Sequence, residues 1–144
     1  MTSKRAVAPL RAEDYQRLLA FRMELRAFLR WSEEAAHQAG LTPSIHQLLL
    51  VTRGHHTVAE GPTVGEAAEA LHIRHHSAVE LAQRAEAMGL VQRERDGEDH
   101  RRVRLRLTDE GQACLEVLTR DHLARIAALA QTLEGVVHQV ALED

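Results

Sequence analysis

The fold of this chain is decided by residues 93–111, which read Arg-Glu-Arg-Asp-Gly-Glu-Asp-His-Arg-Arg-Val-Arg-Leu-Arg-Leu-Thr-Asp-Glu-Gly. The stretch predicts a β-hairpin that leads directly into a helix. Asp96-Gly97-Glu98-Asp99 is typical of a turn, because Gly and Asp favour the backbone conformations that turns need. Thr108 and the two carboxylates after it are typical of a helix N-terminus. Apolar and basic residues alternate along the second strand, which therefore has one face to bury: Val103, Leu105 and Leu107 against Arg102, Arg104 and Arg106.

Two short helices are predicted immediately before the hairpin. Thr63-Val64-Gly65-Glu66 is a capping box, which opens a helix. A second helix is predicted from about Arg74 to Met88, and Gly89 follows at the position where a left-handed residue commonly ends a helix. Two helices joined by a tight turn and followed by a two-stranded ribbon are the order of a winged helix-turn-helix.

The motifs of this region resemble those of the MarR family of bacterial transcriptional regulators. The resemblance lies in the ordered set rather than in one specific motif, and it covers nearly the whole chain. It implies a mainly α fold with a small β-wing (α+β), a winged helix-turn-helix with long N- and C-terminal dimerisation helices. The matching positions are Leu71, Ile73, Ser77, Leu81, Arg84, Glu86, Gly89, Leu90, Val91, Asp96, Asp99, Arg101, Leu107, Thr108 and Gly111.

We expect a single MarR-like domain over residues 1–144. Within it, residues 11–39 are the predicted N-terminal dimerisation helix, residues 42–107 the winged helix-turn-helix DNA-binding part, and residues 108–144 the C-terminal dimerisation helix. A short strand at Val58 could join the ribbon. The last helix predicts a homodimer, because its apolar residues have the spacing of a coiled-coil seam that one small core cannot cover. This seam consists of Leu123, Ile126, Ala130, Leu133, Val137 and Val140.

Composition is that of a soluble protein without extreme features. The single cysteine excludes an internal disulfide, which suits a cytoplasmic protein. Because no apolar run approaches the roughly 18 residues of a membrane span and no apolar segment follows the first residues, we expect neither membrane insertion nor secretion. The net charge of −3 is unlike that of many DNA-binding proteins. We expect the acidic residues to lie on helices away from the ribbon, so that its six arginines remain available to a polyanion.

The second helix of the pair is the predicted recognition helix, with the N-terminal part of its exposed face in the major groove. Arg74 stands where relatives usually have a capping Ser or Asp, so the cap is weaker and one more positive charge faces DNA. The role of Glu80 stays open between reading a cytosine amine and repelling phosphate. The predicted DNA-binding residues of this helix are Arg74, His75, His76, Ser77, Glu80 and Arg84.

The hairpin tip supplies the remaining predicted DNA contacts, which are Asp99, His100, Arg101 and Arg102. Asp99-His100-Arg101 resembles the Asp-x-Arg element of the family. The resemblance implies that Arg101 enters the minor groove and that Asp99 orients it. A narrow A·T minor groove concentrates negative potential and attracts guanidinium, which agrees with that role.

The resemblance also implies control by a small aromatic ligand. Phe28, Trp31, His46 and Arg53 are the predicted ligand contacts, with Arg53 holding a carboxylate. Ordinary core packing is the alternative interpretation of the two aromatic residues.

The chain offers little for chemistry. Of its ten histidines, His72 and His76 have the i, i+4 spacing of a chelating pair, but no Cys or carboxylate stands at ligand spacing nearby, so we expect no metal and no other cofactor. Cys114 is expected to be a small buried residue. Ser77, His75 or Cys114 could be combined with His122 as nucleophile and base. Since no oxyanion hole or orienting group accompanies them, we predict no catalytic residue and no enzyme.

The sequence therefore predicts a cytoplasmic transcriptional regulator, a repressor or an activator, that binds double-stranded DNA sequence-specifically as a homodimer. A small aromatic ligand could relieve this binding. The alternative is a winged-helix protein-interaction module without DNA binding, and Arg74 together with the six ribbon arginines argues against it.

Overall fold

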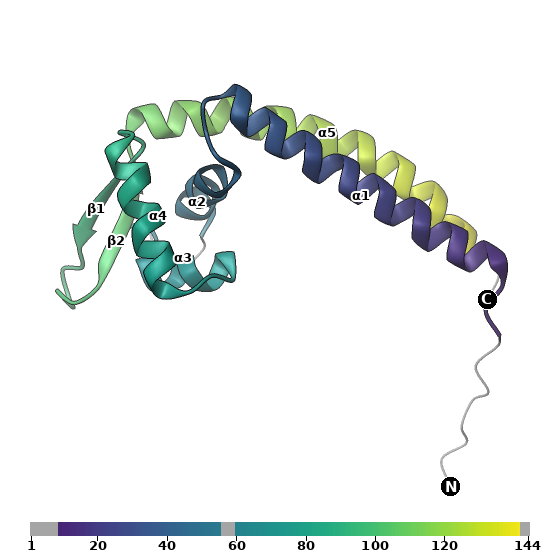
Figure 1. Cartoon of the computed structure of the whole chain (residues 1–144), viewed down its shortest axis with the longest axis horizontal. Coiled ribbons are helices and arrows are strands. Elements are labelled where there is room, and N and C mark those ends of the chain that lie inside the picture. Colours follow the sequence, from purple (N-terminus) through teal and green to yellow (C-terminus); the bar gives the residue numbers. More distant parts are fainter. Residues whose placement is uncertain (1–8, 56–59, 142–144) are drawn as a thin grey trace, which may run out of the picture. The chain divides into compact units, whose positions relative to one another are not determined.

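The computed structural model describes residues 9–55 and 60–141, with the side chains of residues 132 and 135–141 left out. The chain forms two compact units, one of them Ser32–Leu123 and the other the segments up to Trp31 and from Ala124 onward. The predicted fold class, mainly α with a small antiparallel β-wing, is confirmed. The elements are α1 (Ala12–Gln38), α2 (Pro43–Gly54), α3 (Val64–Leu71), α4 (His75–Ala87), β1 (Val91–Arg95), β2 (Val103–Leu107) and α5 (Asp109–Ala141) (Figure 1).

The helices begin and end at the residues that the sequence signals indicate. Thr42 caps α2, its hydroxyl accepting a hydrogen bond from the Ile45 backbone N–H. Thr63 and Glu66 form the predicted capping box of α3, in which each side chain accepts a hydrogen bond from the backbone N–H of the other residue. Gly89, with φ +74°, follows α4 in the left-handed conformation. The two caps fix where α2 and α3 begin, and Gly89 fixes where α4 ends and hence where the wing starts.

The core of the Ser32–Leu123 unit is built from the inward faces of α2, α3, α4 and the sheet. Small residues on the inner face of α4 let the helix lie close to its neighbours. Met88, the predicted end of the helix, is the C-cap residue and is exposed. The fully buried positions include Ile45, Leu48, Leu49, Ala67, Ala78, Ala82, Ala85, Val91 and Leu105.

The wing is an antiparallel pair of strands in which Val91 lies opposite Leu107 and Arg95 opposite Val103. The segment before α3 adds a third, very short contact to this ribbon, because the Leu105 N–H donates to the Pro62 carbonyl at 2.8 Å and Thr63 bridges to Arg104. Val58, predicted as a short strand here, lies outside the described residues. The root of the wing is thus fixed to the start of α3.

The connection between the two strands is longer than predicted. Its hydrogen-bonded turn is closed by the Arg102 N–H donating to the Asp99 carbonyl at 2.9 Å, not within residues 96–99. Gly97 does not adopt a positive φ. The reason is that Asp96 continues the ladder, its N–H donating to the Arg102 carbonyl at 2.9 Å while its side chain is buried.

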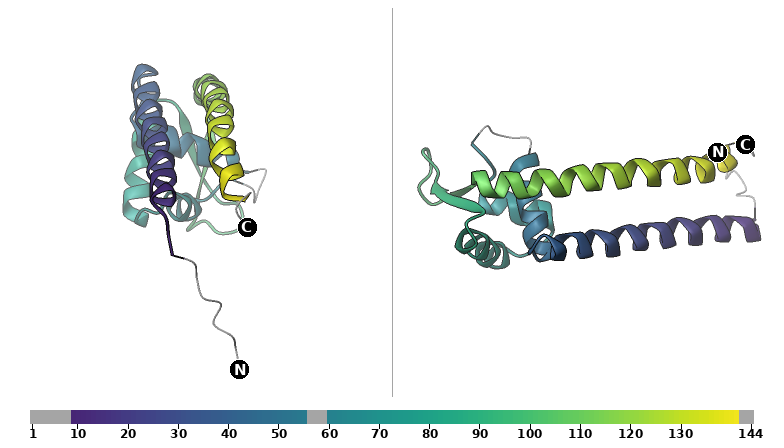
Figure 2. Two further views of the ribbon diagram at one scale, coloured as in Figure 1. Left: turned by 90° about the vertical axis from the view of Figure 1, so that its right-hand side faces the viewer. Right: turned by 90° about the horizontal axis from the view of Figure 1, so that it is seen from above.

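The second unit consists of antiparallel segments of α1 and α5 (Figure 2). In it, the rings of Phe28 and Trp31 lie 5.9 Å apart, and the Arg125 guanidinium lies over the Trp31 ring at 5.5 Å. Most large apolar residues of α1 are exposed rather than buried. Over residues 9–55 and 60–141, no helix combines the length and apolar character that a membrane crossing requires.

Candidate nucleic-acid interface

The turn between α3 and α4 aims the predicted recognition helix. His72 adopts φ +54°, and the Ile73 N–H donates to the Ala68 carbonyl at 3.0 Å, which closes α3 and reverses the chain. Because α4 buries Ala78, Leu81, Ala82 and Ala85, its opposite face must point outward. That outer face of α4, defined here as Arg74, His76, Glu80 and Arg84, is exposed along its whole length.

The four residues of this outer face make no side-chain hydrogen bond or ion pair with any other part of the described chain. Arg74 is the N-cap residue and provides no side-chain cap, as predicted, so the first N–H groups of α4 lack a side-chain acceptor there. His75 is also exposed, whereas Ser77 is half-buried. Uncapped N–H groups and unpaired charges are available to an external partner.

The tip of the wing presents one strongly exposed guanidinium. Asp99 Oδ1 accepts from the Arg101 backbone N–H at 3.0 Å and from Arg101 Nε at 3.3 Å, which holds the base of the side chain. The side chain of Arg101 is nevertheless 92% exposed, and His100 beside it is exposed too. Arg102 shares the same carboxylate, with its Nε 3.7 Å from Asp99 Oδ2. The predicted orientation of Arg101 by Asp99 is therefore present as a contact, while the role in DNA binding stays a prediction.

A groove of about 380 Å³ separates α4 from the wing. Its α4 wall contains His75 and Val79, and its wing wall contains Arg101 and Arg102. The first turn of α3, with Glu66, closes the groove between them. Of the predicted DNA-binding residues, the groove therefore brings together His75 of the recognition helix with Arg101 and Arg102 of the tip.

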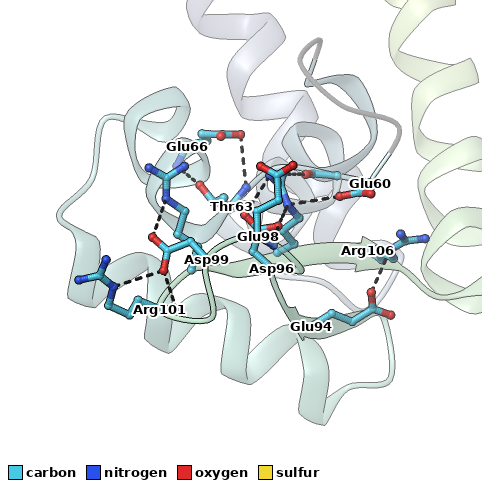
Figure 3. A network of polar contacts seen from close by, with 12 residues as sticks. Glu60, Thr63, Glu66, Glu94, Asp96, Glu98, Asp99, Arg101 and Arg106 are labelled. Atoms are coloured by element: carbon cyan, nitrogen blue, oxygen red, sulfur yellow. Dashed lines mark hydrogen bonds and ion pairs between the residues drawn. The ribbon is translucent and has the colours of Figure 1, made fainter.

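The expectation that acidic residues keep away from the ribbon is wrong. Five of its six arginines are paired with carboxylates: Arg101 and Arg102 with Asp99, Arg93 with Glu86, Arg104 with Asp96 and Glu60, and Arg106 with Glu94. Figure 3 shows this network, with Asp99 and Arg101 at one end and Glu94 and Arg106 at the other. The period-2 pattern placed the arginines on the polar face correctly, but it could not show how many carboxylates share that face.

Two of these arginines join the wing to other parts of the unit, Arg93 to α4 and Arg104 to the segment before α3. Arg93 donates from its backbone N–H and from Nε to the two carboxylate oxygens of Glu86, each at 3.0 Å, and so links β1 to the C-terminal part of α4. The hydrogen bonds from Arg93 lower the pKa of Glu86. Arg104 donates to the Gly61 carbonyl at 2.8 Å and pairs with Asp96 at 3.2 Å. The hydrogen bond from Arg104 lowers the pKa of Asp96, so this carboxylate stays ionised at neutral pH.

The predicted ligand contacts are distributed over both units. Phe28 and Trp31 belong to the unit of α1 and α5 segments, where both are half-buried. His46 and Arg53 belong to the Ser32–Leu123 unit. His46 is buried, whereas Arg53 is exposed at the end of α2 and lines a groove of about 330 Å³ with Arg106 and Gln112. The ligand-binding role of these residues stays a prediction.

A cluster that sequence reasoning did not assemble connects α1, α2 and α5. The Ser32 hydroxyl and His122 Nε2 lie 2.7 Å apart, and His122 Nδ1 lies 2.7 Å from the Leu118 carbonyl. The ring of His46 lies 4.8 Å from that of His122. Burial and the neighbouring His122 lower the pKa of His46. No sequence spacing predicts this cluster, because Ser32 and His122 are 90 residues apart.

Metal-binding and thiol chemistry have little support. No three His, Cys, Asp or Glu side chains converge on a metal position within the residues that the structure describes. Cys114 is half-buried on α5 and packs against the core, and burial together with Glu110 raises the pKa of its thiol. A raised pKa disfavours the thiolate and therefore reactivity.

Comparison with known proteins identifies the fold that carries this surface. The sequence model of the MarR family matches residues 39–102. The resemblance to the MarR family is confirmed. A comparison with curated proteins gives no significant match.

Solved structures extend the MarR-like fold over most of the chain. A variant of S. aureus MepR bound to an oligodeoxyribonucleotide is 20% identical, with a TM-score of 0.69 over 88% of this chain and 96% of that one. AbsC, a MarR family transcriptional regulator from Streptomyces coelicolor, is 16% identical, with a TM-score of 0.66 over 94% and 99%. CouR from Rhodococcus jostii, bound to p-coumaroyl-CoA, is 18% identical, with a TM-score of 0.64 over 85% and 89%.

Proposed function

We propose that this MarR-like protein is a cytoplasmic, sequence-specific DNA-binding transcriptional regulator that acts as a homodimer. In this proposal α4 enters the major groove and Arg101 enters the minor groove. One observation carries it: the outer face of α4 is exposed and unpaired within the described chain, and His75 of the same helix lines one groove with a wing tip whose Arg101 is 92% exposed. MepR, which shares the fold, has been solved with a bound oligodeoxyribonucleotide, and this supports DNA as the partner in the proposal.

Electrostatics favour DNA over other partners for this surface. Arg74, Arg84 and Arg95 are exposed and form no ion pair within the described chain. The N-terminus of α4 adds the positive end of a helix dipole with no capping side chain. Phosphates would be contacted by these groups without first breaking an internal ion pair, while His76 and Glu80 offer donors and acceptors to base edges.

The homodimer part of the proposal rests on exposed apolar side chains. Leu18 and Leu25 of α1 are 58% and 41% exposed, and Leu123 and Ile126 of α5 are 61% and 46% exposed. Water contact with so many large apolar residues is unfavourable, and a second copy would remove it. Of the predicted seam, the side chains of Val137 and Val140 lie outside those described.

Sedimentation of the wild type and two matched variants tests the dimer. We expect the wild type to sediment at twice the chain mass at micromolar concentration and Leu25→Glu to sediment as a monomer. Leu50→Glu is the control, because Leu50 is similarly exposed at 48% but lies on α2. A monomeric wild type with unchanged helix content would refute the dimer.

Relief by a small aromatic acid is the second part of the proposal, with Phe28, Trp31, His46 and Arg53 as its contacts. The p-coumaroyl-CoA bound to CouR shows that a protein of this fold can hold an aromatic acyl ligand. The chain has one tryptophan, so its fluorescence reports binding directly. We expect an active ligand to change Trp31 fluorescence and DNA affinity at the same concentration, since the two equilibria are linked.

Selection of DNA from a random pool by the purified protein tests the main proposal. We expect an enriched inverted repeat, bound with an affinity that falls steeply with salt concentration. A pool that shows no enrichment, together with binding that salt does not affect, would instead favour a winged-helix protein-interaction module.

A further inference from the structure

Arg104 differs from every other paired arginine of the wing in its burial. Its side chain is 14% exposed, compared with 47% for Arg106, two residues further along the same face of β2. The guanidinium lies between the wing and the segment before α3. A cation in this position cannot reach DNA phosphate without leaving its partners, so its charge serves a purpose inside the protein.

The contacts of Arg104 join three separate segments. One terminal nitrogen donates to the Gly61 carbonyl at 2.8 Å, the other donates to Asp96 Oδ2 at 3.4 Å, and Nε lies 3.2 Å from Asp96 Oδ1. A planar guanidinium can satisfy a carbonyl on one side and a carboxylate on the other, whereas an ammonium group lacks this fixed fork. Gly61 is itself tightly placed, because a Cβ there would meet the Leu105 carbonyl.

Asp96 connects the contacts of Arg104 to the wing tip. Its side chain is 7% exposed, and its backbone N–H donates to the Arg102 carbonyl at 2.9 Å. The next contact outward is the Arg102 N–H to the Asp99 carbonyl, and Asp99 holds Arg101. Figure 3 shows Asp96 in the middle of this network and Asp99 with Arg101 beyond it. A continuous series of contacts therefore runs from the root of the wing to its exposed tip.

We propose that Arg104 is a positioning residue for DNA binding: by fixing Asp96 to Gly61 it determines where the wing tip presents Arg101 to the minor groove. This inference rests on the proposed function. Arg104 acts through Arg101 and does not touch DNA. The lowered pKa of Asp96 fits this arrangement, because the carboxylate is ionised at neutral pH and can hold the guanidinium there.

A double-mutant cycle distinguishes positioning from a simple contribution of charge. Arg104→Lys keeps the charge but removes the fork, and Arg101→Ala removes the group that is positioned. We expect Arg104→Lys to weaken binding to the selected operator roughly fivefold, within the range of couplings found in one network. In the Arg101→Ala background the same change should have an effect below about twofold. Equal effects in both backgrounds, or no effect in either, would overturn the proposal.

Arg106→Lys is the matched control, since Arg106 is on the same strand and the same face and is paired with Glu94 at the surface. Its effect should add to that of Arg101→Ala without coupling. Asp96→Asn is a second route to the same test if Arg104→Lys fails to fold, which thermal unfolding would reveal. It should show the same coupling to Arg101→Ala.

Hydrogen exchange supplies a readout that needs no DNA. Arg104→Lys should speed exchange of the backbone amides of residues 97–102 while leaving α4 unchanged, and Arg106→Lys should not. Exchange that rises equally throughout the unit would make Arg104 a general stabilising residue and reject positioning. A wild type that selects no DNA would refute the proposed function, and the exchange result would still decide whether Arg104 fixes the tip.

Discussion

The outer face of α4 and the wing are both rich in charge, but they hold it in opposite states. On α4, Arg74, Glu80 and Arg84 are exposed and have no ionic partner within the described chain. On the wing, most arginines are already paired with carboxylates, and the side chain of one of them, Arg104, is only 14% exposed. The helix presents its charges to solvent, whereas the wing uses most of its charges to hold its own shape.

The number of charged residues in a segment is therefore a poor guide to the charge that is available for binding. The ribbon of residues 91–107 contains six arginines against four carboxylates, and Glu60 and Glu86 from neighbouring segments add two more. Exposed ion pairs contribute little to stability individually, but a network that includes a guanidinium with little solvent exposure can fix a hairpin in place. We therefore expect substitutions in the wing to change DNA binding by altering the shape of the hairpin. Substitutions on the outer face of α4 should change it by removing direct contacts with DNA.

The largest expected effect comes from breaking the root of the wing while leaving α4 intact. Gly61→Ala places a Cβ in steric conflict with the Leu105 backbone carbonyl, at a residue with φ +85°. Strain and overpacking together should lower the free energy of unfolding by roughly 2–5 kcal/mol. Chemical denaturation measures this loss, and DNA binding should weaken for all sequences alike.

Gly97→Ala is the control for that substitution. It lies in the same wing, but a Cβ there meets no atom within 4 Å and its φ is not positive. We expect a change within about 0.5 kcal/mol. Similar losses of stability for both variants would mean that the root of the wing is no more constrained than its tip.

The boundaries of helices and strands could be predicted because they depend on residues close in sequence. The capping box at Thr63, the cap at Thr42 and the glycine after α4 each act within a few residues, and in the structure helices begin at the two threonines and one ends before the glycine. The pairing of Arg104 with Asp96 and Gly61 could not be predicted, since it depends on how α3 meets the ribbon. The same reason hid the contact between Ser32 and His122.

The second prediction concerns base preference on α4. Glu80 is an unpaired acceptor on α4, the proposed recognition helix, so Glu80→Gln should shift the preferred base at one half-site position by roughly 1–3 kcal/mol. Selection from a random pool followed by fluorescence anisotropy measures the shift. Glu116→Gln, the same charge change on α5, should not alter preference. If Glu80→Gln instead strengthened binding to every sequence equally, Glu80 would be a residue that repels phosphate.

The third prediction separates the wing tip from α4 by salt dependence. Arg101→Ala should weaken binding to most sequences by roughly 1 kcal/mol, about fivefold, because a charged contact is lost. The slope of log affinity against log salt should fall by about 0.9, as for one phosphate contact. His76→Ala should leave that slope nearly unchanged at neutral pH and redistribute affinity among sequences. An unchanged slope in Arg101→Ala would place the tip away from DNA.

The smallest expected effect is a dependence of stability on pH that comes from one buried histidine. His46 is buried beside His122, which lowers its pKa from 6.5 and disfavours its protonated form. As the pH falls below 6.5, His46 takes up a proton more readily in the unfolded chain than in the folded one. The free energy of unfolding is therefore highest above that pH and decreases as the solution is acidified.

Chemical denaturation between pH 8 and pH 5 isolates the buried histidine. We expect the wild type to lose stability toward pH 5 and His46→Gln to show a flatter dependence, while His76→Gln follows the wild type. If His46→Gln and the wild type had parallel stability profiles, the burial of His46 would carry no proton linkage.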